Sequence, residues 1–208
     1  MNIPVVYEDD WLLVVDKPAG LLTIPTPKNE SRTLTSILND DLEARHLTYR
    51  LHPCHRLDRD TSGLIIYAKG KSFEKKMAEL FRLRKIKKTY IAFVQGNLKQ
   101  PVGRINSPIE GLTSETKYKV IEKRKIFDIV EVHPLTGRTN QIRIHFKNLG
   151  HPILGDTKFA FRRDFLLKSK RLCLHAERLE FVHPETNRPV ILKSALPKEL
   201  KDFLIKNS

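Results

Sequence analysis

Residues 55–63, with the sequence HRLDRDTSG, place a carboxylate between two arginines and end in turn-forming residues. The apolar run from Leu64 to Ala68 follows at once and predicts a strand, so the charged segment is predicted to be a loop that leads into it. Proteins that bind polyanions usually keep carboxylates out of such a place, because they repel phosphate. An Asp here is therefore predicted to do chemistry. The alternative is a surface Asp–Arg cluster that caps a turn, because most surface charge clusters are solvated or weakly paired.

The length of the chain and its composition favour one globular domain over residues 1–208. Hydrophobic residues make up 40% and charged residues 30% of the chain, as in ordinary globular proteins. No run approaches the roughly 20 apolar residues that a membrane span needs. The first residues, MNIPVVYEDD, lack the basic start and apolar stretch of a signal peptide. We expect a cytoplasmic protein that does not bind membranes.

The net charge of the chain indicates its partner. Lys and Arg number 38 against 24 acidic residues, a formal net charge of +14. Nucleic acid is the polyanion that such an excess favours. The alternative is an acidic membrane surface, but the sequence shows no convincing basic amphipathic helix that would favour it.

The two cysteines, Cys54 and Cys173, are far apart and lack the paired spacing of a metal site. We expect reduced thiols. The alternative is a zinc site built from His52, Cys54, His55 and a distant His, although tetrahedral zinc sites normally show tighter paired spacing.

Apolar periodicity predicts more strands than helices, in hairpin-like groups. Strands are expected at 5–7, 11–15, 64–68, 90–95, 116–122, 128–133, 172–182 and 190–193. Helices are expected at 34–46, capped by Ser31 or Thr33, at 72–84, at 140–148, and after Pro197. This order predicts an α+β fold with a largely antiparallel sheet and flanking helices rather than a doubly wound fold.

Six segments in order carry a resemblance to one family. HRLDRDTSGLIIYAK closely resembles the catalytic motif of the RluA-type pseudouridine synthases. The other five matches are DKPAGL at 16–21, KKTYIA at 87–92, LTGRTNQIRIH at 135–145, HPILGD at 151–156 and LCLHA at 172–176. The resemblance extends over about residues 5 to 195, nearly the whole chain.

The resemblance implies a pseudouridine synthase catalytic domain with a mixed, bent sheet and an RNA-binding cleft. Some relatives carry a small N-terminal RNA-binding module, and we expect none here, because the first family-like strand begins near residue 5. The implied reaction isomerises uridine in RNA: the base is detached from the ribose, rotated and rejoined through a ring carbon. It implies no metal, nucleotide or redox cofactor.

The resemblance places the catalytic carboxylate at Asp58 and its cationic partner at Arg143. A nearby guanidinium favours the ionised carboxylate and can hold it in fixed geometry. Tyr90 matches the active-site tyrosine, whose ring can stack on uracil and whose hydroxyl can help transfer a proton. The alternative for Tyr90 is a half-buried strand residue. Asp60 is a rival carboxylate, to which we assign a structural or loop-capping role.

Further residues are expected to bind the substrate. A target base must leave its stack before it can react, and the resemblance assigns Arg56 to fill the vacated space. The alternative for Arg56 is a phosphate contact. Leu174 is expected to line the uracil pocket, with ordinary core packing as its alternative. Basic residues expected to contact RNA are Arg82, Lys85, Lys87, Lys88 and Arg138; the alternative for the 82–88 cluster is a solvated basic face.

Two positions depart from the family pattern. Asn140 stands where the family usually has His, and Phe159 stands where it often has Tyr. We expect neither to touch Asp58, Tyr90 or Arg143, and hence no change of reaction class.

The sequence therefore predicts a monomeric, cofactor-free enzyme that converts uridine to pseudouridine in rRNA or tRNA stem-loops, with no DNA partner. One alternative is a non-catalytic RNA-binding protein that retains the fold. The presence of Asp58, Tyr90 and Arg143 argues against it. Another is a hydrolytic glycosidase, which normally needs two cooperating carboxylates.

Overall fold

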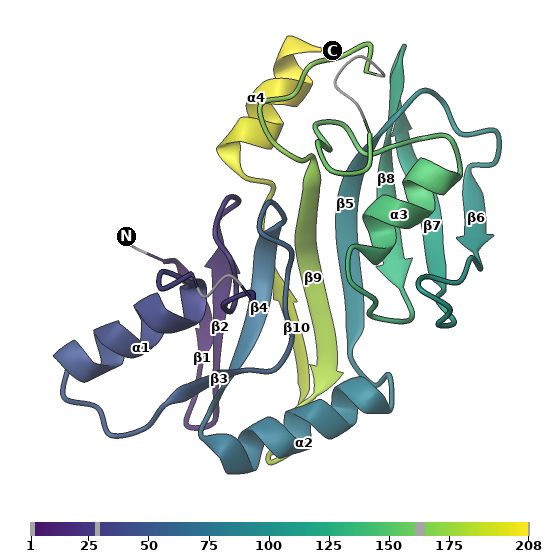
Figure 1. Ribbon diagram of the computed structural model, residues 1–208. Coiled ribbons are helices and arrows are strands. Elements are labelled where there is room, and N and C mark those ends of the chain that lie inside the picture. The colour runs from purple at the N-terminus through teal and green to yellow at the C-terminus, as the bar shows by residue number, and fades with distance from the viewer. Residues whose placement is uncertain (1–2, 28–29, 161–164, 208) are drawn as a thin grey trace. The chain divides into compact units, whose positions relative to one another are not determined.

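The computed structural model describes residues 3–27, 30–160 and 165–207 (Figure 1). The chain divides into two compact units, the first from residues 1–86 and 178–194 and the second from residues 87–177 and 195–208. The strand β9 (Leu174–Val182) gives its first four residues to the second unit and the rest to the first. Each unit is described here by itself.

The first unit is built on antiparallel strand pairs. β1 (Val5–Glu8) pairs with β2 (Leu12–Lys17), and β2 pairs with β4 (Ser62–Lys69). The short β3 (Leu51–Pro53) also pairs with β4, and β10 (Pro189–Lys193) pairs with β9. Because Lys17 stands opposite Gly63, β2 ends where the charged loop of residues 55–63 enters β4.

Two helices cover the two faces of the β2–β4 pair. Successive side chains of β2 and β4 point to opposite faces, so alternate residues pack against different helices. Helix α1 (Leu34–Ala44) begins at a capping box on Thr33 and packs in one cluster with Leu13 and Ile65. Helix α2 (Lys71–Arg82) packs in the other cluster with Leu12 and Ile66. β4 is therefore apolar on both faces, which explains its continuous apolar run. Full burial of one such side chain stabilises the fold by about 1.5–3 kcal/mol.

The second unit contains antiparallel strand pairs and two helices. β5 (Lys87–Gln95) pairs with β8 (Phe127–Pro134), β8 with β7 (Thr116–Lys123), and β7 with β6 (Val102–Ile105). Phe146 of helix α3 (Gln141–Asn148) meets the ring of Tyr118 edge-on at 5.6 Å. Phe203 of helix α4 (Lys198–Lys206) contacts Phe93 and Phe127.

The predicted α+β, largely antiparallel fold is confirmed, and each predicted element is present with ends shifted by a few residues. Thr33 rather than Ser31 caps α1. β3 and β6 were not predicted, because both are very short and neither has a buried apolar run. Across the described ranges, every helix is too short or too polar to cross a bilayer.

Candidate active site

Asp58 lies in the loop between β3 and β4. Its carbonyl accepts a hydrogen bond from Thr61 N at 3.2 Å, which closes a turn just before β4. Leu57 is buried, Asp58 is half-buried, and Arg56 and Arg59 are exposed. A buried apolar residue thus anchors a segment whose charged side chains remain near the surface.

The hydroxyl of Thr23 fixes the backbone just before Asp58. It donates to the carbonyl of Leu57 at 3.1 Å and accepts from the amide of Leu57 at 3.2 Å. Thr23 is only 2% exposed. Its own carbonyl accepts bonds from the amide and hydroxyl of Thr35 in the first turn of α1. The start of α1 therefore holds Thr23, and Thr23 holds the Asp58 loop.

The ammonium group of Lys17 fixes the backbone just after Asp58. Lys17 is fully buried, and its Nζ donates to the carbonyls of Pro18, Leu21 and Arg59 at 2.7–2.9 Å. Gly20, at φ +82°, donates its amide to the same Arg59 carbonyl. Three carbonyl acceptors satisfy a charge that would otherwise be costly to bury.

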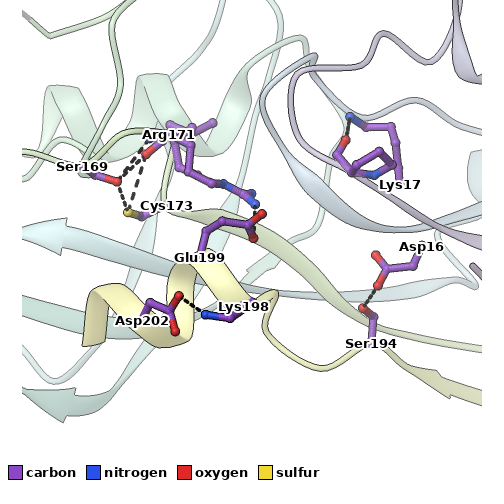
Figure 2. A network of polar contacts seen from close by, with 11 residues as sticks. Asp16, Lys17, Ser169, Arg171, Cys173, Ser194, Lys198, Glu199 and Asp202 are labelled. Atoms are coloured by element: carbon purple, nitrogen blue, oxygen red, sulfur yellow. Dashed lines mark hydrogen bonds and ion pairs between the residues drawn. The ribbon is translucent and has the colours of Figure 1, made fainter. Parts of the chain in front are cut away.

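The residue before Lys17 ties β2 to the end of β10. Ser194 Oγ donates to Asp16 Oδ2 at 2.6 Å, and Figure 2 shows this bond together with the Lys17 side chain. The polar end of β2 is thus bonded both to the backbone of Arg59 and to the side chain of Ser194. The sequence motif marked Asp16 and Lys17 but did not reveal either of these contacts.

The remaining residues of the predicted catalytic set lie in the second unit. Tyr90 is in β5 opposite Val132 of β8 and is 9% exposed. Leu174 is the first residue of β9 and is 3% exposed. Arg143 lies in the first turn of α3 and is 5% exposed. Arg56 and Asp58 belong to the first unit.

Arg143 is held by a buried carboxylate. Its Nε and Nη2 donate to the two oxygens of Asp156, both at 2.8 Å. Such a bidentate pair fixes the plane as well as the position of the guanidinium. Burial would raise the pKa of Asp156, but the hydrogen bonds and charge of Arg143 and the amides of Phe159 and Lys158 bring it below its usual value.

Asn140 and Phe159 both contact Arg143, so the expectation that neither would do so is wrong. Nη1 of Arg143 donates to Asn140 Oδ1 at 3.0 Å, and the guanidinium carbon lies 5.0 Å from the centroid of the Phe159 ring. The sequence did not reveal this, because a bend in the chain brings Phe159 back to α3. The two departures from the family pattern share one neighbour.

A buried amide shapes the loop before α3. Oε1 of Gln141 accepts from Thr136 Oγ1 and from the amide of Arg138, at 2.7 and 3.0 Å. Its Nε2 donates to the carbonyl of Glu115 and to Thr116 Oγ1. Gln141 thus joins this loop to β7, a role that the sequence analysis did not assign.

His145 in the same helix is also structural. It is fully buried, with Nδ1 2.9 Å from Thr116 Oγ1 and Nε2 close to Ser114 Oγ and the Ser107 carbonyl. Burial lowers the pKa of His145. Neutral imidazole therefore suits this site, which links α3 to the chain before β7.

The predicted RNA-contacting cations differ in their surroundings. Lys85 and Lys87 are exposed, whereas Lys88 is half-buried and burial lowers its pKa. Arg82 pairs with Glu79 on the surface of α2. Arg138 is exposed and donates from Nε to the Thr113 carbonyl at 3.2 Å. Lys85 and Lys87 are thus the exposed lysines of the cluster.

The residues of the alternative zinc site have other partners. Nε2 of His55 accepts a hydrogen bond from the amide of Ile66 at 3.0 Å. Burial raises the pKa of the Cys54 thiol to about 12. Within the described ranges, no group of three or more His, Cys, Asp or Glu side chains is arranged to hold a metal ion.

Comparison with known proteins gives consistent matches. The family model for RNA pseudouridylate synthase matches residues 11–148. The dual-specificity RNA pseudouridine synthase RluA of Yersinia pestis is 37% identical over 207 residues, covering 91% of this chain and 97% of the relative. The uncharacterized RNA pseudouridine synthase YhcT of Bacillus subtilis is 31% identical, covering 97% and 71%.

Two human structures have a similar fold. The structure of human RNA pseudouridylate synthase domain containing 4 has a TM-score of 0.84 at 23% identity, covering 98% of this chain and 92% of that one. The structure of domain containing 1 has a TM-score of 0.74 at 26% identity, covering 94% and 84%.

Proposed function

This chain belongs to the RNA pseudouridylate synthase family, and from that premise we propose that it isomerises uridines of rRNA or tRNA stem-loops with Asp58 as its catalytic carboxylate and without a cofactor. Enzymes of this family are isomerases that act on RNA. The observation that carries the assignment is the anchoring of Leu57 and Arg59 by Thr23 and Lys17 on either side of Asp58. A carboxylate on a rigid backbone loses little entropy when it meets a substrate.

The roles of the other groups follow from their chemistry. Asp58 supplies an anionic oxygen for nucleophilic attack or for proton removal. Arg143 favours the ionised carboxylate. Tyr90 stacks on uracil or relays a proton, and Leu174 offers an apolar wall to the base. Arg56 is exposed, as a side chain that replaces an extruded base must be.

The class of RNA is the less specific part of the proposal. Relatives include the dual-specificity RNA pseudouridine synthase RluA and, at 34% identity, the ribosomal large subunit pseudouridine synthase C of Vibrio vulnificus. Their names support rRNA as one substrate class of this chain. We place the enzyme in the cytoplasm as a monomer that acts on RNA and not on DNA.

Asp58→Asn tests the catalytic assignment. The amide is nearly isosteric, so folding and RNA binding should persist, but it lacks the anionic oxygen that attacks or removes a proton. We expect pseudouridine formation to fall at least 10³-fold, in the range seen when a nucleophile is removed. Pseudouridine yield on a transcript that the wild type modifies is the readout, alongside a binding isotherm.

Asp60→Asn is the matched control and should retain most activity, because Asp60 is assigned a role in the loop. Substantial turnover by Asp58→Asn would place the catalytic carboxylate elsewhere. If only Asp60→Asn lost activity, Asp60 would be the catalytic carboxylate and Asp58 would have the role in the loop. A third outcome is that the wild type and both variants bind RNA but form no pseudouridine in any part of total RNA. That outcome would favour the non-catalytic RNA-binding protein.

Chelation tests the absence of a cofactor. Activity should survive exhaustive EDTA treatment and dialysis, because side chains carry each assigned role. A loss of activity that zinc restores would overturn the cofactor-free mechanism and point to His52, Cys54 and His55. Magnesium should be restored in a parallel sample, since RNA folding itself depends on cations and a defect of the substrate must be separated from a defect of the enzyme.

A further inference from the structure

We propose that Asp156 is a positioning residue of the enzyme, which together with Asn140 and Phe159 holds the guanidinium of Arg143 in one orientation. All four residues lie in the second unit, so the contacts among them are contacts within that unit. The inference rests on the proposed function, in which Arg143 takes part in the reaction. We call Asp156, Asn140 and Phe159 the guanidinium clamp.

Three sides of the Arg143 side chain are in contact with the clamp. Asp156 receives Nε and Nη2 at 2.8 Å each, and Asn140 receives Nη1 at 3.0 Å. The Phe159 ring lies against the guanidinium, and the guanidinium carbon is 5.0 Å from the centroid of the ring. Each nitrogen of the guanidinium therefore has an acceptor in the clamp. A long side chain with several rotatable bonds is thus held in one conformation.

Asp156 is itself fixed by its backbone surroundings. Its Oδ1 accepts bonds from the amides of Lys158 and Phe159 at 2.9 and 3.0 Å as well as from Arg143. The residue before it, Gly155, has φ +76°, and an added Cβ would lie 2.0 Å from the carbonyl oxygen of Arg171. The chain therefore approaches Arg171 closely at this point, and it delivers the carboxylate to Arg143 at a defined place.

Asn140 suits its place for two independent reasons. It stands at the N-cap of α3 in the left-handed region, with φ 55°, which Asn tolerates better than most residues. Its side chain makes no capping bond to the helix and is directed to Arg143 instead. Asn140 could cap the helix, but its side-chain oxygen accepts a hydrogen bond from the guanidinium instead.

The contacts of Arg143 fix the orientation of its guanidinium and do not increase its effective positive charge. Asp156 offsets the positive charge of Arg143, so an unpaired Arg143 would be the stronger cation. A buried guanidinium needs a partner to be stable, and here the partner binds it through two parallel hydrogen bonds that also fix its plane. We infer that the direction of the Arg143 donors is what the clamp provides, and that a small misplacement of this group lowers the rate of the chemical step.

Matched variants at Asn140 and Phe159 test the clamp without removing the buried ion pair. Asn140→Gly permits the left-handed backbone and removes the acceptor, whereas Asn140→Asp keeps an acceptor. Phe159→Leu removes the ring, whereas Phe159→Tyr keeps it. We expect kcat to fall about 10-fold in Asn140→Gly and in Phe159→Leu, with KM for RNA within twofold of the wild type. Asn140→Asp and Phe159→Tyr should retain kcat within threefold.

Asp156→Asn provides the stronger perturbation, and its folding must be checked because breaking a buried pair is strongly destabilising. For variants with wild-type far-UV and near-UV spectra, kcat should fall on the order of 10²-fold with little change in KM. If Asp156→Asn does not fold, the Asn140 and Phe159 pairs decide the question. Equal kcat values within both matched pairs would overturn the clamp.

Arg143→Lys separates failure of the clamp from failure of the proposed function. A lysine keeps the charge and loses the planar donors, so we expect a loss at least as large as that of Asp156→Asn. In the Arg143→Lys background, Asn140→Gly should cause little further loss, because the group that it positions is gone. Full activity of Arg143→Lys would refute the role of Arg143 in the proposed function. A defective Arg143→Lys beside fully active clamp variants would refute the clamp alone.

Discussion

At the scale of single residues, the Asp58 loop depends on two polar side chains that are distant in sequence. Thr23 and Leu57 are 34 residues apart, and Lys17 and Arg59 are 42 apart. Both Thr23 and Lys17 are buried, and both bond to backbone groups of this loop. The backbone on both sides of Asp58 is thus fixed by residues that are distant in sequence.

Thr23→Val tests this anchoring. Valine keeps the volume but loses the hydroxyl, and the buried amide and carbonyl of Leu57 then lack their partner. We expect a loss of unfolding free energy of about 1–3 kcal/mol and a lower kcat. Urea denaturation and pseudouridine yield measure the two effects. Thr48→Val, at an exposed position, is the control and should change stability by less than about 0.5 kcal/mol; an equally small change in Thr23→Val would refute the anchoring.

The sequence predicted the residues of the Asp58 segment but not what holds them. Asp58, Tyr90 and Arg143 stand in segments whose order and wording resemble one family. Thr23 lies in a proline-containing loop that also contains Thr26, and nothing in its local pattern indicates a buried hydroxyl. In the sequence, Asp156 is only the last residue of the HPILGD segment, because its bond to Arg143 depends on a fold-back of the chain that periodicity does not describe.

At the scale of elements, apolar spacing predicted what packs on a core and missed what pairs only at an edge. Helices α1 and α2 bury one stripe each, so their spacing is visible in the sequence. β6 pairs with β7 and alternates between exposed and half-buried residues, and β3 contains only three residues. Neither carries enough apolar residues to distinguish it from a loop.

Gly155→Ala tests the turn that presents Asp156. Gly155 and Gly111 have nearly equal φ values, +76° and +73°, so alanine meets similar backbone strain at both positions. An added Cβ meets the Arg171 carbonyl only at Gly155, whereas the surroundings of Gly111 within 4 Å are open. We expect Gly111→Ala to cost roughly 1 kcal/mol and Gly155→Ala clearly more, with reduced kcat. Thermal unfolding compares the two, and equal costs would mean that the close approach to Arg171 relaxes.

At the scale of the whole molecule, charge is the property that the sequence stated most directly. The net charge of +14 can be counted from the sequence without knowledge of the fold. It predicts a polyanionic partner for a chain of this family. What the fold adds is the distinction among the cations of residues 82–88. Arg82 is paired with Glu79, Lys88 is half-buried, and Lys85 and Lys87 are exposed.

RNA binding should therefore be strongly sensitive to salt, and Lys85 and Lys87 should account for a defined part of that sensitivity. Each phosphate contact contributes a slope of about −0.7 to −0.9 to the logarithm of affinity against the logarithm of salt. Lys85→Ala with Lys87→Ala should make the slope about 1.5 units less steep and weaken binding to many RNAs alike, because these residues contact phosphate and not base edges.

The matched control removes the same charge from exposed positions on α4, with Lys201→Ala and Lys206→Ala. If binding reads only net charge, both double variants will lose affinity equally and the 82–88 cluster will have no special role. If the cluster contacts RNA, the slope will change only for the Lys85 and Lys87 pair. Isotherms at several salt concentrations measure the slopes, and an affinity independent of salt would contradict the electrostatic account, since counterion release accompanies any phosphate contact made by a cation.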